Sequence, residues 1–130
     1  MTGVDTNVLV RFVMADDPEQ YRKAKRLMQS FTMQSPCFIT QVCIAEFVWV
    51  LEARYRKSKT IIIEWLSWLV ESNELVLEDQ PAVERALHAY AASKADFSDC
   101  LIAISGHLAG CSSTVTFDKG AAKTAGMRLL

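Results

Sequence analysis

Residues Thr40 to Leu51 read TQVCIAEFVWVL, and the last ten of these contain nine apolar residues and a single acid, Glu46. Placing an ionised carboxylate among apolar side chains is costly unless the charge has a partner. We therefore expect Glu46 to lie near a basic residue such as Arg11, a set of hydrogen-bond donors, a metal ion or a wet cleft. The run predicts a helix over residues 41–56. Its expected packing residues are Val42, Cys43, Trp49 and Val50.

The composition bounds the class of protein. At 130 residues, with 51% hydrophobic and 22% charged residues, the chain is expected to form one globular domain over residues 1–130. A net charge of -1 argues against the general basic coat of a non-specific nucleic-acid binder, but leaves room for a local basic patch. The N-terminus lacks the basic region of an export signal, and the apolar run Ile61 to Val70 is too short to span a membrane. We therefore expect a cytoplasmic protein.

The cysteines and histidines suggest neither disulfides nor zinc. The chain has no C-x-x-C pair, and His88 and His107 have no ligand-like spacing to any cysteine. The interpretation is that the cysteines are small buried residues in a reducing compartment. They are Cys37, Cys43, Cys100 and Cys111.

Short β-like runs alternate with longer helical runs along the chain. The predicted strands cover residues 1–5, 37–40, 74–78, 113–117 and 127–130. Helices are predicted between them, among them residues 59–72, 98–107 and 119–125. This alternation indicates a parallel sheet with helices on both faces and right-handed crossovers. In such sheets, ligands bind beyond the carboxyl ends of the strands.

Several acids are predicted to meet at that edge. Asp5 directly follows the first strand and Asp118 the fourth, while Asp99 lies in the first turn of a helix, three residues after Asp96. Glu46 is one and a half turns into the helix after the second strand. Carboxylates this close raise one another's pKa unless a cation lies between them, and an oxygen-only set suits Mg²⁺ or Mn²⁺. The alternative for each Asp is an ordinary helix cap or turn residue.

Four segments in order resemble the PIN-domain family, and within it the VapC-type toxin ribonucleases of bacterial toxin–antitoxin pairs. They are GVDTNVLVR (residues 3–11), TQVCIAEFVWVL (40–51), ADFSDCLIA (95–103) and TVTFDK (114–119). The resemblance covers nearly the whole chain. It implies a three-layer α/β/α sandwich with a central, mostly parallel sheet of four or five strands.

The resemblance also implies the site residues. The metal-binding and catalytic quartet would be Asp5, Glu46, Asp99 and Asp118, with Asp96 as an additional acid. The polar positions that support the carboxylates or a bound water would be Thr6, Asn7 and Thr116. The implied cofactor is Mg²⁺ or Mn²⁺.

The activity implied by the resemblance is metal-dependent endonucleolytic cleavage of structured RNA such as tRNA or rRNA. A metal-activated water would attack the scissile phosphorus. The implied partners are a small VapB-like antitoxin and a second copy of the chain, in a homodimer, heterotetramer or larger complex. The expected RNA-binding residues are Arg11, Arg54, Arg56 and Lys57. A further basic group, formed by Arg22, Lys23, Lys25 and Arg26, is interpreted first as a solvated helix face.

Other classes of function compete with the nuclease. A phosphotransfer enzyme of the haloacid dehalogenase type would use Asp5 as a covalent nucleophile, but its usual second acid two residues later is replaced here by Asn7. A receiver domain is not matched in its paired acids. A non-catalytic PIN-like module that binds RNA or protein remains open.

Overall fold

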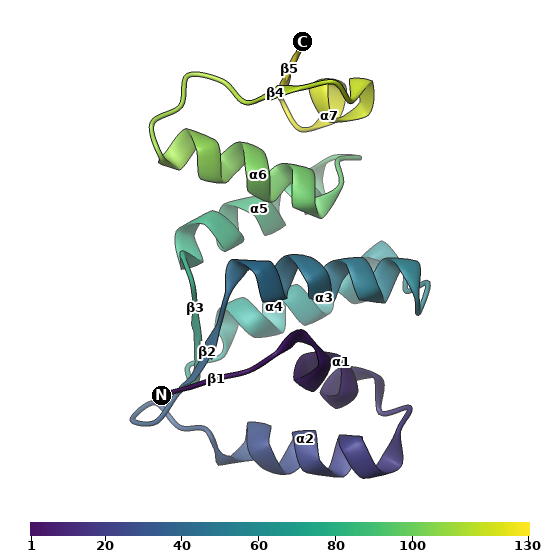
Figure 1. Ribbon diagram of the computed structural model, residues 1–130, viewed down its shortest axis with the longest axis vertical. Helices are drawn as coiled ribbons and strands as arrows, with labels where there is room; N and C mark the ends of the chain where they lie inside the picture. The colour runs from purple at the N-terminus through teal and green to yellow at the C-terminus, as the bar shows by residue number, and fades with distance from the viewer. The chain divides into compact units, whose positions relative to one another are not determined.

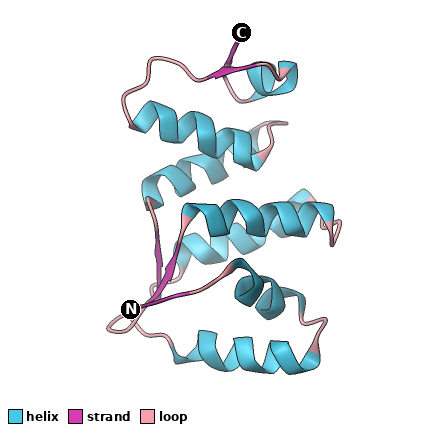
Figure 2. Ribbon diagram, viewed as in Figure 1, coloured by secondary structure: helices cyan, strands magenta, loops and turns pink.

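The computed structural model describes all residues from Met1 to Leu130 as seven helices and five strands (Figures 1 and 2). The strands are β1 (Thr2–Gly3), β2 (Cys37–Ile39), β3 (Leu75–Leu77), β4 (Val115–Thr116) and β5 (Arg128–Leu129). The helices are α1 (Thr6–Met14), α2 (Pro18–Ser30), α3 (Gln41–Ala53), α4 (Lys59–Glu71), α5 (Gln80–Ala92), α6 (Phe97–Leu108) and α7 (Lys119–Thr124). Each predicted strand and helix is present, with ends that differ by a few residues.

By its internal packing the chain divides into two compact units, Met1–Glu78 and Asp79–Leu130. The first unit contains a three-stranded sheet in the order β1-β2-β3, and both pairings are parallel. In its register Phe38 lies opposite Gly3 on one side and opposite Val76 on the other. The second unit contains the parallel pair β4-β5. The predicted α/β class with parallel strands is confirmed. The expected single sheet of four or five strands is not observed, because β4 and β5 pair only with each other and not with β1, β2 or β3.

The core of the first unit is built from α1, α3, α4 and the central strand. α1 contacts both α2 and α3, and α4 contacts β3 (Figure 1). The fully buried side chains there include Leu9, Ile39, Phe47, Leu51 and Leu66. Although α4 is strongly apolar, no helix of the chain is long and apolar enough to cross a membrane.

The second unit is built around helices α5 and α6, which pack closely against each other (Figure 1). Tyr90 and Phe97 meet edge to face with ring centroids 5.8 Å apart, a favoured geometry for aromatic pairs. Phe97 and Val83 are fully buried. This packing fixes the start of α6, which carries two of the predicted site acids.

Side-chain capping sets most of the helix starts. In six of the seven helices, the residue before the first turn accepts a hydrogen bond from the backbone N–H three positions later. These N-caps are Asp17, Thr40, Ser58, Asp79, Asp96 and Asp118. Such caps satisfy backbone donors that the helix itself leaves unpaired. α1 is the exception, because the side chain of its N-cap, Asp5, makes no capping hydrogen bond.

Two expectations about α3 are wrong. Val42 and Trp49 were expected to pack in the core, yet they are 65% and 60% exposed. The reason is helical periodicity: residues 42, 46 and 49 share one face, and that face is turned outward. Cys43, Phe47 and Leu51 form the opposite, buried face.

The cysteines follow the prediction with one exception. None of the four forms a disulfide, and Cys37, Cys43 and Cys100 are buried. Burial, followed by the nearby Cys43, raises the pKa of Cys37 to about 11, so this thiol stays protonated at neutral pH. Cys111 is exposed, contrary to the prediction, because it lies beyond the C-terminal end of α6 in the loop to β4.

Candidate functional site

Asp5 occupies the junction between β1 and α1. Its backbone carbonyl accepts a hydrogen bond from the N–H of Val8 at 3.0 Å, so the chain enters the helix normally. Its side chain is exposed and, unlike the other six N-caps, is not used for capping. The carboxylate of Asp5 is therefore free of the structural role that was the alternative interpretation for this residue.

Glu46 finds its partner on α1. The hydroxyl of Thr6 donates to Glu46 Oε2 at 2.9 Å, and Thr6 is only 6% exposed. The partner is thus a buried hydroxyl and not Arg11, one of the candidates considered from sequence. The side chain of Glu46 lies on the exposed face of α3, so it needs no buried counter-charge. The Thr6 bond orients a solvent-accessible carboxylate.

Cys43 lies near both Asp5 and Glu46, the two acids in the first unit. Its thiol is 3.5 Å from the Thr6 hydroxyl, and Cys43 precedes Glu46 by one helical turn. Burial is the main cause that raises the pKa of Cys43, and the negative charges of Asp5 and Glu46 raise it further. Both carboxylates are therefore near the same buried thiol. Asp5 and Glu46 thus both lie within electrostatic reach of Cys43 in the first unit.

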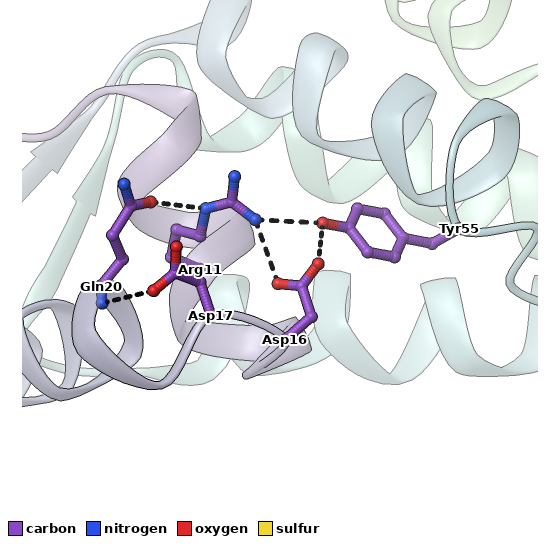
Figure 3. Close-up of polar contacts among 5 residues, drawn as sticks. All are labelled: Arg11, Asp16, Asp17, Gln20 and Tyr55. Atoms are coloured by element: carbon purple, nitrogen blue, oxygen red, sulfur yellow. Dashed lines mark hydrogen bonds and ion pairs between the residues drawn. The ribbon is translucent and has the colours of Figure 1, made fainter.

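Arg11 belongs to a different network (Figure 3). Its guanidinium donates to Gln20 Oε1 at 2.7 Å and forms an ion pair with Asp16 at 3.0 Å. The Tyr55 hydroxyl donates to the other oxygen of Asp16 at 2.7 Å. This bond, with that of Arg11, lowers the pKa of Asp16, and the same bond raises the pKa of Tyr55.

The network joins the end of α1, the start of α2 and the chain just after α3 (Figure 3). The sequence analysis did not identify Asp16 as a partner of Arg11. The available signal was their spacing of five residues across the break between α1 and α2. Arg11 has a structural contact set here, while Arg54, Arg56 and Lys57 are exposed at the end of α3.

The second group of acids lies in the second unit. Asp96 Oδ1 accepts from the N–H of Asp99 at 3.2 Å and so caps α6. Asp118 Oδ1 accepts from the N–H of Ala121 at 3.0 Å and caps α7. The capping role that was left open for these two residues is therefore real. Each carboxylate still has a second oxygen beyond the capping bond.

Two further contacts fix Asp118. The Thr116 hydroxyl accepts a hydrogen bond from the N–H of Asp118 at 2.9 Å. A Cβ added at Gly120 would lie 3.0 Å from Asp118 Oδ1, so the absence of a side chain there leaves room for the carboxylate. The segment from Thr116 to Ala121 thus holds Asp118 in one orientation.

Asp99 has a shifted pKa. Its pKa is raised by partial burial first, and then by the negative charges of Asp96 and Asp118. Each cause disfavours the ionised form of Asp99. Asp96 and Asp118 are thus near enough to Asp99 for their charges to disfavour its ionisation.

The raised pKa of Asp99 gives a testable prediction about stability. A carboxyl group whose pKa is raised on folding stabilises the protein below its ordinary pKa of 3.8, and this contribution is lost as the pH rises through the folded value. At neutral pH the charge of Asp99 is therefore unfavourable, and Asp99→Asn should raise the melting temperature of the metal-free protein. The gain should disappear below about pH 3.8, where wild-type Asp99 is also neutral. Melting curves in a chelator at several pH values test this, and an equal gain at all pH values would contradict it.

The donor chemistry of both groups suits a hard divalent cation. The first unit offers the carboxylates of Asp5 and Glu46, and the second offers Asp96, Asp99 and Asp118. Carboxylate oxygens are the ligands that Mg²⁺ and Mn²⁺ prefer. Within neither unit do three or more Asp, Glu, His or Cys side chains gather closely enough to hold a metal by themselves. Of the predicted quartet, Asp5 and Glu46 lie in the first unit, and Asp99 and Asp118 lie in the second.

A family comparison identifies the fold. The family model of the PIN domain matches residues 4–127, which include all four acids of the predicted quartet. The chain belongs to the PIN domain family. A search among curated proteins found no match. PIN domains are generally metal-dependent nucleases, so the match confirms the PIN fold class, supports a broad assignment to nucleases, and argues against the haloacid dehalogenase alternative.

Proposed function

We propose that this protein is a metal-dependent endoribonuclease, the toxin component of a VapBC-type toxin–antitoxin module, which cleaves structured RNA such as tRNA or rRNA. The observation that carries the proposal is the PIN match over residues 4–127, in which acids occupy the expected positions after the strands and in the early turns of the helices. The side chain of Asp5 also supports the proposal. Its carboxylate makes no capping hydrogen bond, so a helix-capping role does not account for an acid at this position.

Each polar residue has a role in the proposed mechanism. Asp5, Glu46, Asp99 and Asp118 would hold Mg²⁺ or Mn²⁺, with Asp96 as an additional acid. When bound, the ion would activate a water and offset the charge that develops on the phosphate. Thr6 keeps Glu46 Oε2 oriented, and Thr116 restrains the backbone at Asp118. Glu46 or Asp99 would accept the proton from the attacking water.

The proposed partners follow from the toxin assignment. A cognate VapB-like antitoxin would cover the acids, and a second copy of the chain would form a homodimer within a cytoplasmic complex. Arg54, Arg56 and Lys57 remain candidates for contact with RNA, since they are exposed cations at one end of α3. Arg11 is a weaker candidate, because its guanidinium is already engaged with Asp16 and Gln20.

A cleavage assay tests the proposal directly. Purified protein is incubated with total tRNA and rRNA in Mg²⁺, in Mn²⁺ and in a chelator, and the 5′ ends of the products are sequenced. The proposal predicts discrete cleavage positions that require the divalent ion. Binding of RNA without cleavage in either metal would instead favour the non-catalytic module.

Metal should also change the stability of the protein. Because an ion that binds only the folded state stabilises it by mass action, a metal concentration of one hundred times the Kd should add about 2.7 kcal/mol. The melting temperature should therefore rise with Mg²⁺ or Mn²⁺ but not with an equal ionic strength of NaCl. Glu46→Gln should reduce this shift. Absence of any shift in the wild-type protein would argue against a shared metal site.

A further inference from the structure

Two adjoining hollows lie along α2 in the first unit. One, of about 240 Å³, lies between α1 and α2, and Val8, Ala24 and Leu27 contribute its apolar lining. The other, of about 190 Å³, is lined by Glu19, Arg22, Lys23 and Arg26. Lys23 lines both hollows, so they are neighbours.

The first hollow combines an apolar wall with amide groups. Asn7 and Gln20 line it beside the aliphatic side chains. Gln20 is held by Arg11, whose Nε donates to Gln20 Oε1 at 2.7 Å, and Figure 3 shows the two side chains next to each other. That bond uses the amide oxygen and leaves the amide NH₂ to donate elsewhere. The volume is below the range of about 300–1,000 Å³ typical of sites for drug-sized ligands, so a smaller planar group suits it.

The second hollow is strongly cationic. Three cations and one acid line it, although the whole chain has a net charge of -1. The ion pair between Lys23 and Glu19 spans 3.5 Å and is more than three-quarters exposed on both sides, so it holds Lys23 only weakly. The sequence alone favoured a solvated helix face for this basic group. The hollow gives this group a concave surface with more cations than acids, which suits an anion.

We propose that these hollows bind one unpaired nucleotide of an RNA chain, with the base in the groove between α1 and α2 and the adjacent phosphates against Lys23, Arg22 and Arg26. Unpaired bases are recognised by apolar contact together with hydrogen bonds to their edges, which Asn7 and Gln20 offer. Asn7 lies two residues after Asp5, so the proposed nucleotide site would adjoin that acid. The inference rests on the proposed ribonuclease function and names a subsite for its substrate.

The position of an apolar hollow beside a cationic one favours RNA over a peptide as the ligand. A nucleic-acid strand presents a base and then a charge in regular sequence, which matches an apolar hollow followed by a cationic one. An acidic peptide would satisfy the cations but would place no planar base in the apolar hollow between α1 and α2. Peptide binding is therefore an outcome that the experiment must separate.

Binding is measured without cleavage, in a chelator, with a short fluorescent single-stranded RNA at several salt concentrations. Each phosphate contact on a single strand contributes about 0.7 to the slope of log K against log salt. Lys23→Gln should reduce this slope by about that amount. Lys25→Gln is the matched control, because Lys25 is on the same helix, lies over the Tyr21 ring and lines neither hollow. It should leave the slope unchanged.

The base is tested through Leu27. Leu27→Asn should weaken RNA binding about fivefold to tenfold with no change in slope, since it removes apolar contact and no charge. Leu27→Met should bind as wild type, and circular dichroism checks that both variants fold. Equal effects of Lys23→Gln and Lys25→Gln, wild-type binding by Leu27→Asn, or an absence of RNA binding by the wild type would overturn the proposal. The proposal would also be overturned if an acidic peptide bound this groove while substitutions in the groove left RNA binding unchanged.

These outcomes are separable from failure of the proposed function. If the protein cleaves RNA with metal while all groove variants bind equally, the function stands and the subsite is wrong. If the groove variants behave as expected but no metal supports cleavage, the subsite stands and the catalytic assignment is wrong.

Discussion

Asp5→Asn should reduce metal-dependent RNA cleavage by about a thousandfold, while the protein remains folded. The substitution keeps the size of the side chain and removes its charge, and the structure gives the Asp5 side chain no capping bond to lose. The expected loss is therefore one of ion binding and charge stabilisation. Initial rates at saturating Mn²⁺ measure it, with melting temperature as the check on folding.

The matched control is Asp79→Asn. Asp79 is also the residue before a helix, and its side chain accepts from the N–H of Ala82. Its backbone is in the left-handed region at φ 50°, which Asn tolerates well, and Asn is an equally good cap. This variant should cleave RNA at the wild-type rate. If Asp5→Asn cleaves as fast as Asp79→Asn, Asp5 is not a catalytic or metal-binding residue.

The sequence predicted the elements well because their signals are local. The spacing of apolar residues in α2 and α5, together with the caps Asp17, Asp79 and Asp118, is readable within a few residues. The parallel pairing of β1, β2 and β3 followed from the helices between them, since parallel strands need long crossovers. These features depend little on distant parts of the chain.

The orientation of α3 was harder to predict, because nearly all of its residues are apolar. When both faces of a helix are apolar, periodicity does not indicate which face is buried. The unusual residue, Glu46, carried the answer: Val42 and Trp49 share its face and are exposed with it. An acid in an apolar helix here marks the outward face and not a buried charge.

The polar partners were the least predictable part of the candidate site. The contact of Thr6 with Glu46 joins residues 40 positions apart, and that of Tyr55 with Asp16 joins residues 39 apart. Such pairs depend on how α1 and α3 pack, which no local pattern encodes. The family resemblance supplied Thr6 as a supporting residue but could not supply Tyr55, whose role is specific to the Arg11 network.

The largest expected effect on stability is that of Phe47→Ala. Phe47 is fully buried on α3, next to Glu46 in sequence, and its truncation leaves a cavity in the core of the first unit. Truncating a buried Phe typically costs about 3–5 kcal/mol, a large part of the total stability of a small domain. Trp49→Ala removes a larger side chain from the same helix, yet Trp49 is 60% exposed and its loss should cost less than about 1 kcal/mol.

Tryptophan fluorescence during urea unfolding separates these two results, because all three tryptophans lie in the first unit. Trp68 contacts Phe12 and Trp65 at centroid distances of 5.5 and 5.7 Å, so the signal remains when Trp49 is replaced. Phe47→Ala should lower the urea midpoint sharply and Trp49→Ala should barely move it. The reverse order would mean that the outward face of α3 is buried in solution, and the exposed position of Glu46 would then be wrong as well.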